Sequence, residues 1–182
     1  KSGALPVRLH LPDVTLVAID TICHELTALV VKECLCKVRF GAVQIYTDNS
    51  APFRIGIDSE IIEAPRFASL DEVMCCLWYR VPQHVATSHA LIIQWDSGIV
   101  SQALWTERFL ECDYVGAPWG WHGDKYEVGN GGFSLRSSRL MQHIAARRQR
   151  FPIGHPEDDL LCRRYRPDLE REGFRWAPND IA

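Results

Sequence analysis

The chain has 182 residues, of which 47% are hydrophobic and 24% are charged. These values predict one globular domain, residues 1–182, that is large enough to bury a core. The formal net charge of -3 argues against a nucleic-acid-binding protein. No run reaches 18 consecutive apolar residues, so we predict no membrane span. The N-terminal residues show no signal-peptide pattern.

Seven cysteines are present, an odd number, and no pair has the spacing of a zinc site. Most of them fall inside apolar patterns, where cysteine behaves as a small hydrophobic residue. We therefore predict reduced thiols and a cytoplasmic protein. A lumenal enzyme with disulfides is the alternative.

The first 50 residues predict a strand, a helix and a second strand. Residues 14–20, VTLVAID, are apolar and β-branched, and residues 42–47, AVQIYT, repeat that character. Between them, residues 21–38 show a helical spacing of apolar side chains: Leu26, Leu29, Val30, Cys34 and Leu35. Such a βαβ unit has parallel strands, so Asp20 and Asp48 should lie at the same edge of the sheet. Nucleotides bind at that edge in open α/β sheets.

A short strand at residues 60–63 and a helix follow. Ser69 and Glu72 have the spacing of a capping box, which predicts a helix start. We expect this helix to run to about Arg80 and to end at Pro82. Its buried face should carry Val73, Cys76 and Leu77.

The stretch HALIIQWDSGIV predicts the central strand. Four apolar residues, 90–93, run into polar turn residues that include Gln94 and Asp96. Asp96 is then placed where a carboxylate holds a metal ion or a metal-bound phosphate. The alternative is an Asp that only bonds its own turn.

The last 80 residues predict shorter elements. Ser137 or Ser138 should cap a helix that reaches about Arg150, Pro156 should occupy a first helical position, and Gly173 should end the last helix. The remaining segments are a short helix at 104–110, strands at 114–116, 133–135 and 174–177, and an exposed loop at 118–125.

Four stretches together carry a resemblance to a known family: QWDSG, FLECDYVGAPW, EVGNGGFSLRSSRL and HPEDDLLCRRY. In order and approximate spacing, from about Thr15 to Pro178, the chain resembles poorly characterised glycosyltransferase-like domains. These domains are similar to GT-A type nucleotide-sugar transferases. The resemblance implies a single Rossmann-like α/β domain with a mainly parallel sheet and flanking helices. It also implies an inverting, hexosyltransferase-like enzyme that takes a nucleotide-sugar donor and a carbohydrate or other hydroxyl acceptor.

The resemblance also implies site residues. GT-A enzymes hold a Mn or Mg ion on an Asp-any-Asp pair; here Asp96 matches the second acid, whereas Gln94 replaces the first. Glu157, Asp158 and Asp159 match the acidic triplet that supplies the catalytic base, with Asp158 as the base itself. Acids in a first helical turn also complement the helix dipole without any other role. The C-terminal metal histidine of GT-A enzymes has no match, so the chain is either truncated at Ala182 or lacks that ligand.

Further residues are candidates for substrate contacts. Gly131 and Gly132 would let the backbone approach an acceptor sugar, or would only form a tight turn. Trp119 and Trp121 would stack on an acceptor sugar, or would anchor their loop on the core. We place the donor beside Asp20, Asp48, Gln94 and Asp96.

Two other functional classes stay open at this point. A non-catalytic nucleotide- or sugar-binding domain would keep the pocket but would not need Asp158. A metal-dependent phosphotransferase or hydrolase would use the same acids for a different reaction.

Overall fold

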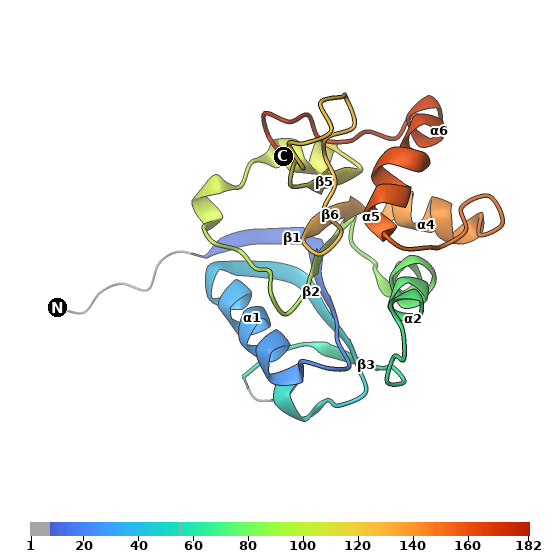
Figure 1. Cartoon of the computed structure of the whole chain (residues 1–182). Coiled ribbons are helices and arrows are strands. Elements are labelled where there is room, and N and C mark those ends of the chain that lie inside the picture. Colours follow the sequence, from blue (N-terminus) through green and yellow to red (C-terminus); the bar gives the residue numbers. More distant parts are fainter. Residues whose placement is uncertain (1–7, 55) are drawn as a thin grey trace.

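A six-stranded sheet crosses the molecule in the order β3-β2-β1-β4-β6-β5 (Figure 1). The computed structural model describes residues 8–54 and 56–182. Strands β1 to β4 are parallel, whereas β6 is antiparallel to both β4 and β5. The strands are β1 (Leu9–Ile19), β2 (Val38–Thr47), β3 (Glu60–Glu63), β4 (His89–Ile93), β5 (Tyr114–Gly116) and β6 (Ser134–Ser137). The predicted mainly parallel α/β fold is confirmed.

Helices cover both faces of this sheet (Figure 1). On one face, α1 packs over a core that includes Leu16, Ile45, Leu91 and Leu135. On the other face, the remaining α-helices enclose a second core. The α-helices are α1 (His24–Lys37), α2 (Leu70–Cys75), α3 (Val81–His84), α4 (Ser138–Ala146), α5 (Glu157–Asp159) and α6 (Arg166–Arg171). Single 3-10 or π turns are η1 (Ala51–Phe53), η2 (Cys76–Arg80), η3 (Gln102–Leu104), η4 (Glu107–Glu111) and η5 (Leu160–Arg164).

Strand β1 begins at Leu9, whereas the sequence predicted a start at residue 14. It continues through Pro12 because its pairing with β2 shifts register between Leu11 and Thr15. Such an irregularity accommodates a residue without a backbone N–H. The partner position is Gly41, where an added Cβ would lie 1.9 Å from the Pro12 carbonyl oxygen. Only glycine allows the two backbones to approach this closely.

The apolar stripe predicted for α1 is only partly buried. Leu26 and Leu29 are 49% and 56% exposed, and the buried side chains are Thr27, Ala28, Val31 and Cys34. The helix also starts at His24 rather than at residue 21, because Asp20 accepts hydrogen bonds from the backbone N–H groups of Ile22 and Cys23.

Pro82 does not end the second helix. Ser69 caps α2 as predicted, accepting the Glu72 N–H at 3.3 Å. The chain then passes through the π turn η2 into α3, which contains Pro82 near its start. The π turn directly before Pro82 interrupts the regular i to i−4 hydrogen-bond pattern, which is where a helical run accommodates a residue without a backbone N–H.

Four predictions for the C-terminal half also need correction. Residues 104–110 form parts of two 3-10 turns, and α4 ends at Ala146 rather than near Arg150. Pro156 precedes α5 as its N-cap with extended ψ. Residues 174–177 make a single bridge, Tyr114 to Trp176, instead of a strand. These segments are short, so periodicity was a weak guide to them.

All seven cysteines are free thiols, as predicted. Cys36 and Cys75 are exposed, whereas Cys34, Cys76, Cys112 and Cys162 are buried. Burial raises the pKa of all four, to about 11 for Cys76 and about 12 for Cys162.

We expect thiol reagents to distinguish these two groups. A raised pKa lowers the thiolate fraction, and only the thiolate reacts. In the native protein Cys36 and Cys75 should react first and the four buried thiols only after unfolding. Denatured, non-reduced protein should titrate seven thiols; five or fewer would reveal a disulfide.

Gly116 at the end of β5 should resist substitution. An added Cβ would lie 1.8 Å from the Gly129 carbonyl oxygen. Gly116→Ala should therefore lower the free energy of unfolding by about 1–3 kcal/mol, the usual cost of overpacking. Gly98→Ala is the control, because its Cβ would meet only side-chain atoms at 3.4 and 3.8 Å. Urea unfolding measures both; equal stability of the two variants would contradict the prediction.

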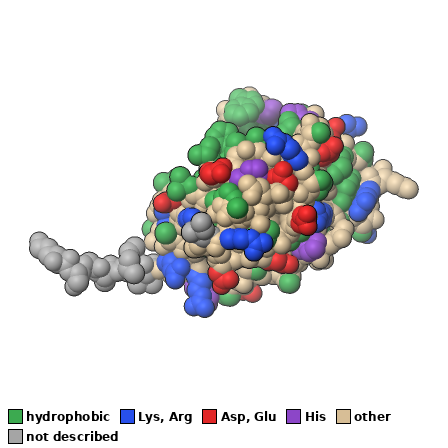
Figure 2. Space-filling view, turned by 90° about the horizontal axis from the view of Figure 1, so that it is seen from below, with side chains coloured by type: hydrophobic (Ala, Val, Ile, Leu, Met, Phe, Trp, Pro, Cys, Tyr) green, Lys and Arg blue, Asp and Glu red, His purple; other side chains and the backbone are tan. Residues whose placement is uncertain are grey.

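Acidic and basic side chains are interspersed on the face of the molecule shown in Figure 2. Of the helices that the structure describes, none has the length and apolar character needed to cross a membrane.

Candidate active site

A cavity of about 290 Å³ opens where the chain changes direction across the sheet. From β1 the chain adds β2 and β3 on one side, and it then crosses to β4 on the other side. The cavity includes Ile19 at the end of β1 and Ile93 and Gln94 at the end of β4. Ligands bind at this switch point, beyond the carboxyl ends of the strands, in open α/β folds. We call this edge of the sheet the carboxyl edge.

The turn after β4 is tied to the glycine loop, residues 129–132. Ser97 Oγ donates to the Gly132 carbonyl oxygen at 3.1 Å and accepts the Gln94 backbone N–H at 2.8 Å. The Gln94 side chain lies against the same loop, because a Cβ on Gly132 would be 2.7 Å from Gln94 Oε1. Both segments line the cavity.

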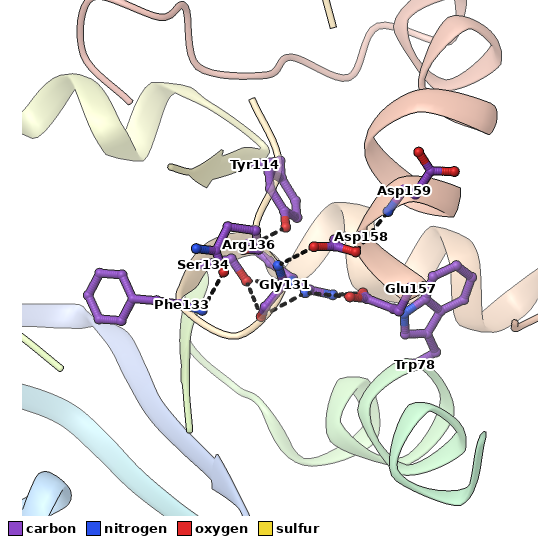
Figure 3. Close-up of polar contacts among 10 residues, drawn as sticks. Trp78, Tyr114, Gly131, Phe133, Ser134, Arg136, Glu157, Asp158 and Asp159 are labelled. Carbon is purple, nitrogen blue, oxygen red and sulfur yellow. Dashed lines mark hydrogen bonds and ion pairs between the residues drawn. The ribbon is translucent and has the colours of Figure 1, made fainter. Parts of the chain in front are cut away.

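Asp158 is a half-buried carboxylate in the cavity wall. Its Oδ2 accepts the Gly131 N–H at 3.3 Å, and its Oδ1 accepts the Asp159 N–H at 3.0 Å (Figure 3). These backbone donors fix the orientation of the carboxylate. Remaining lone pairs on both oxygens leave it able to accept a proton from a bound hydroxyl.

Glu157 has a different environment although it is adjacent in the sequence. It is 6% exposed, and its Oε1 accepts from Arg136 at 2.5 Å and from the Trp78 indole N–H at 2.8 Å. Its Oε2 accepts a second Arg136 bond at 3.3 Å. Both oxygens of Glu157 are thus occupied by protein donors (Figure 3).

Arg136 is the buried cation of this site, with 2% of its surface exposed. Burial alone lowers the pKa of Arg136, but the adjacent Glu157 charge raises it, and the net shift is upward. The guanidinium therefore stays charged and compensates Glu157.

The structure brings five predicted site residues to this cavity: Gln94, Gly131, Gly132, Glu157 and Asp158. The remaining five, Asp20, Asp48, Asp96, Trp119 and Trp121, are not part of its lining.

The three aspartates that follow β1, β2 and β4 share the carboxyl edge, as parallel strands require. Asp20 is buried, and its second oxygen accepts the Thr27 hydroxyl at 2.7 Å, so it holds the start of α1. Asp48 pairs with His24 Nε2 at 2.7 Å. Asp96 lies exposed in the turn after β4.

The two tryptophans of the exposed loop differ from each other. Trp119 is partly buried against the core, and a Cβ on Gly129 would lie 2.0 Å from its ring. Trp119 therefore anchors the loop. Trp121 is 72% exposed, and its ring is 5.8 Å from that of His122.

The loop itself is held by Glu127, which is 6% exposed. The Glu127 carboxylate accepts the N–H groups of Gly120 and Gly123. A bond from Arg163 to the Tyr126 carbonyl, at 3.0 Å, joins the loop to the turn that follows α5. The segment carrying Trp121 is thereby linked to the segment carrying Asp158.

The described residues do not build a metal centre by themselves. Among residues 8–54 and 56–182, no three His, Cys, Asp or Glu side chains gather to hold an ion. Asp96 offers a hard oxygen ligand, and Gln94 offers a neutral amide.

A second cavity, of about 330 Å³, lies over the α1-facing side of the sheet and is lined by Leu91, Leu135 and Val115 among other apolar groups. None of the described side chains in its lining is a carboxylate, a cation or a histidine. Proton transfer is therefore best supported at the carboxyl edge.

Sequence reasoning did not identify Trp78, Ser97 or Arg136 as part of the site. The sequence carries one indication of the role of Arg136. A charged residue inside the short strand SLRS requires a partner if it is buried. Trp78 donates to Glu157, which lies 79 positions further along the chain. Nothing in the sequence near either residue indicates that contact.

The site and sheet define a Rossmann-like α/β protein with a carboxylate cavity at the switch point. Its residues 66–182 match a family model described as "Protein of unknown function (DUF5672)", and the chain belongs to this family. No curated protein matches the chain.

Solved structures with a similar fold include two glycosyltransferases. The mannosyltransferase PcManGT from Pyrobaculum calidifontis, in complex with GDP-Man and Mn2+, has 12% identity and a TM-score of 0.61 over 99% of this chain and 59% of its own. Glycosyltransferase GlyE from Streptococcus pneumoniae TIGR4 has 11% identity and a TM-score of 0.52 over 90% and 44%. The chain thus spans less than two thirds of either enzyme.

A third similar structure is 2-C-methyl-D-erythritol 4-phosphate cytidylyltransferase from Thermus thermophilus. It has 12% identity and a TM-score of 0.51, over 89% of this chain and 87% of its own. At these identities the three likenesses concern the fold.

Proposed function

We propose that the chain is a glycosyltransferase that moves a sugar from a nucleotide-diphosphate donor to a hydroxyl acceptor, with inversion. One observation carries the proposal: the switch-point cavity joins Gln94, the glycine loop and the oriented Asp158 carboxylate. The similar folds of two glycosyltransferases, one of them in complex with GDP-Man and Mn2+, support it. A GT-A type architecture and a cytoplasmic location belong to the same proposal.

In this proposal Asp158 is the general base. It takes the proton of the acceptor hydroxyl while that oxygen forms a bond to the anomeric carbon. The bond from the anomeric carbon to the diphosphate oxygen breaks, and the nucleoside diphosphate leaves with the electron pair. Trp121 is the proposed stacking surface for an acceptor sugar, and Gly131 and Gly132 allow close approach of the backbone.

The donor would lie along the carboxyl edge, with Gln94, Asp48 and Asp96 as its polar contacts and Asp20 holding the adjacent helix start. Asp96 is the proposed protein ligand of a Mn or Mg ion. Such an ion commonly takes most of its ligands from phosphates and water, which suits a site with one carboxylate.

Nucleotidyl transfer is the second candidate, favoured by the likeness to the cytidylyltransferase over most of that enzyme's length. A nucleoside triphosphate brings more negative charge than a nucleotide sugar, and proteins meet such charge with Lys and Arg. Among the described residues that line the cavity, none is Lys or Arg. We therefore favour sugar transfer.

A thermal-shift screen of nucleotide sugars, with and without Mn2+, tests the proposal. A donor at 100 times its Kd should stabilise the fold by about 2.7 kcal/mol, which corresponds to a rise in Tm of about 5–10 °C for a domain of this size. Donors that raise Tm are then incubated with sugar acceptors, and release of nucleoside diphosphate is measured. Stabilisation without turnover would favour a binding module, and stabilisation only by nucleoside triphosphates would favour nucleotidyl transfer.

A further inference from the structure

Asp158 and Glu157 are neighbouring carboxylates, yet only Asp158 is oriented by backbone groups in the cavity wall. Glu157 is buried among the donors of Arg136 and Trp78. An uncompensated buried carboxylate at this position would be costly. Among the described residues, Glu157 thus has an ion-pair partner in Arg136, whereas the half-buried Asp158, the other acid of the cavity lining, has none.

Arg136 also determines the position of the glycine loop. Its Nη2 donates to the Gly131 carbonyl at 3.3 Å, and its Nε donates to Ser134 Oγ at 2.9 Å. Ser134 Oγ in turn donates to the same Gly131 carbonyl at 3.1 Å. The carbonyl of Gly131 is thus held from two sides while its N–H faces Asp158 (Figure 3).

Gly131 packs directly against both Glu157 and Asp158. A Cβ at this position would lie 2.3 Å from Glu157 Oε2 and 3.4 Å from Asp158 Cβ. The loop can therefore approach both acids only because residue 131 is glycine. Below the loop, the Arg136 guanidinium lies 5.2 Å from the centre of the Tyr114 ring, and Tyr114 donates to the Asn130 carbonyl at 3.2 Å.

We propose that Arg136, together with Trp78, is a positioning residue: by gripping Glu157 and the Gly131 carbonyl, it holds the Asp158 carboxylate in the orientation that proton abstraction needs. This role rests on the proposed function, because it acts through Asp158. Neither Arg136 nor Trp78 is part of the cavity lining.

Two conservative variants test this role. Trp78→Phe keeps an aromatic ring but removes the donor to Glu157, and Arg136→Lys keeps the charge but loses the two-pronged contact. Displacing a catalytic group by about 1 Å typically costs about a hundredfold in rate. We therefore expect kcat for sugar transfer to fall by about tenfold to a hundredfold, with the KM for donor changed by less than about twofold.

Trp105→Phe is the matched control. Its indole N–H also donates to a glutamate, Glu107 at 3.0 Å, but at the surface and outside the cavity. This variant should keep wild-type kcat and KM. Circular dichroism and Tm confirm that each variant is folded.

A double variant separates positioning from general loss of structure. If Trp78 acts through Asp158, Trp78→Phe should have almost no further effect on kcat in an Asp158→Asn background, because groups that act as a unit are not additive. Arg136→Lys should likewise have almost no further effect on kcat in the Asp158→Asn background. This second double variant replaces the first if Trp78→Phe does not fold.

Full additivity of the losses, or folded single variants with wild-type kcat, would overturn the positioning role and leave the proposed function intact. Absence of transfer by the wild-type protein with every donor and acceptor would instead remove the proposed function and this role with it.

Discussion

Replacing Asp158 by Asn is expected to lower sugar transfer by roughly a hundredfold to ten-thousandfold, the usual contribution of a positioned base. Asn is nearly isosteric, and its one carbonyl oxygen can still accept the Gly131 N–H, so the loop should keep its place. The Asp159 N–H then faces the amide nitrogen and loses its acceptor. Donor affinity should stay nearly unchanged, because a base that meets only the acceptor contributes little to donor binding. Turnover and donor thermal shift, measured on the same preparation, separate the two quantities.

Asp159→Asn is the control in the same helical turn. Asp159 is about half exposed and lies 3.8 Å from Arg163, and a surface ion pair of this kind contributes little. Its variant should transfer sugar at close to the wild-type rate. Equal rates in Asp158→Asn and wild type would remove the base assignment and favour a binding module.

Asp96→Asn should weaken donor binding, which is the property that Asp158→Asn should leave nearly unchanged. If Asp96 holds a donor-bound ion, this variant should weaken Mn-dependent donor binding by about 1.5–3 kcal/mol, the value of a hydrogen bond or contact to a charged group. A metal titration in the presence of donor measures this change. Unchanged Mn dependence would remove Asp96 as the metal ligand.

Arg136→Met is expected to produce the largest loss of stability, about 3–5 kcal/mol, because it leaves Glu157 buried without its counter-charge. The double variant Arg136→Met/Glu157→Met should recover much of this loss, since an apolar pair of similar volume replaces a buried ion pair at little cost. Urea unfolding of the wild type and of the single and double variants measures the difference. If the double variant is as unstable as Arg136→Met, unpaired charge is not the cause.

The sheet was predictable from the sequence because its central strands are short apolar runs closed by polar residues. The apolar residues 90–93 predicted strand β4. The acids after β1 and β2 predicted the edge of the sheet at which the parallel strands end. Prediction of α1 was less accurate, because Leu26 and Leu29 fit a helical stripe and yet are exposed. Helical spacing identifies a face, but it does not identify which face meets the sheet.

Within the site, local motifs indicated Asp158 and the glycine loop but not what holds them. The distinct environments of Glu157 and Asp158 arise from Trp78 on η2 and Arg136 on β6, which reach Glu157 from distant parts of the chain. Similarly, the separate environments of Trp119 and Trp121 depend on Gly129, where Trp119 fills the space of an absent side chain. Such contacts are set by tertiary packing and have no local sequence signal.

The strand order has a practical consequence for expressing parts of this protein. The family match begins at residue 66, whereas β1, the strand that pairs with β4 through residues 14–18 and 89–93, lies before it. A fragment cut at that boundary would keep β4 but remove its parallel neighbour, uncovering a row of unpaired backbone groups beside the apolar sequence HALII. Exposed apolar edges of this kind pair with other chains. A fragment designed from the family boundary alone should therefore aggregate, and expression designs should retain β1 and β2.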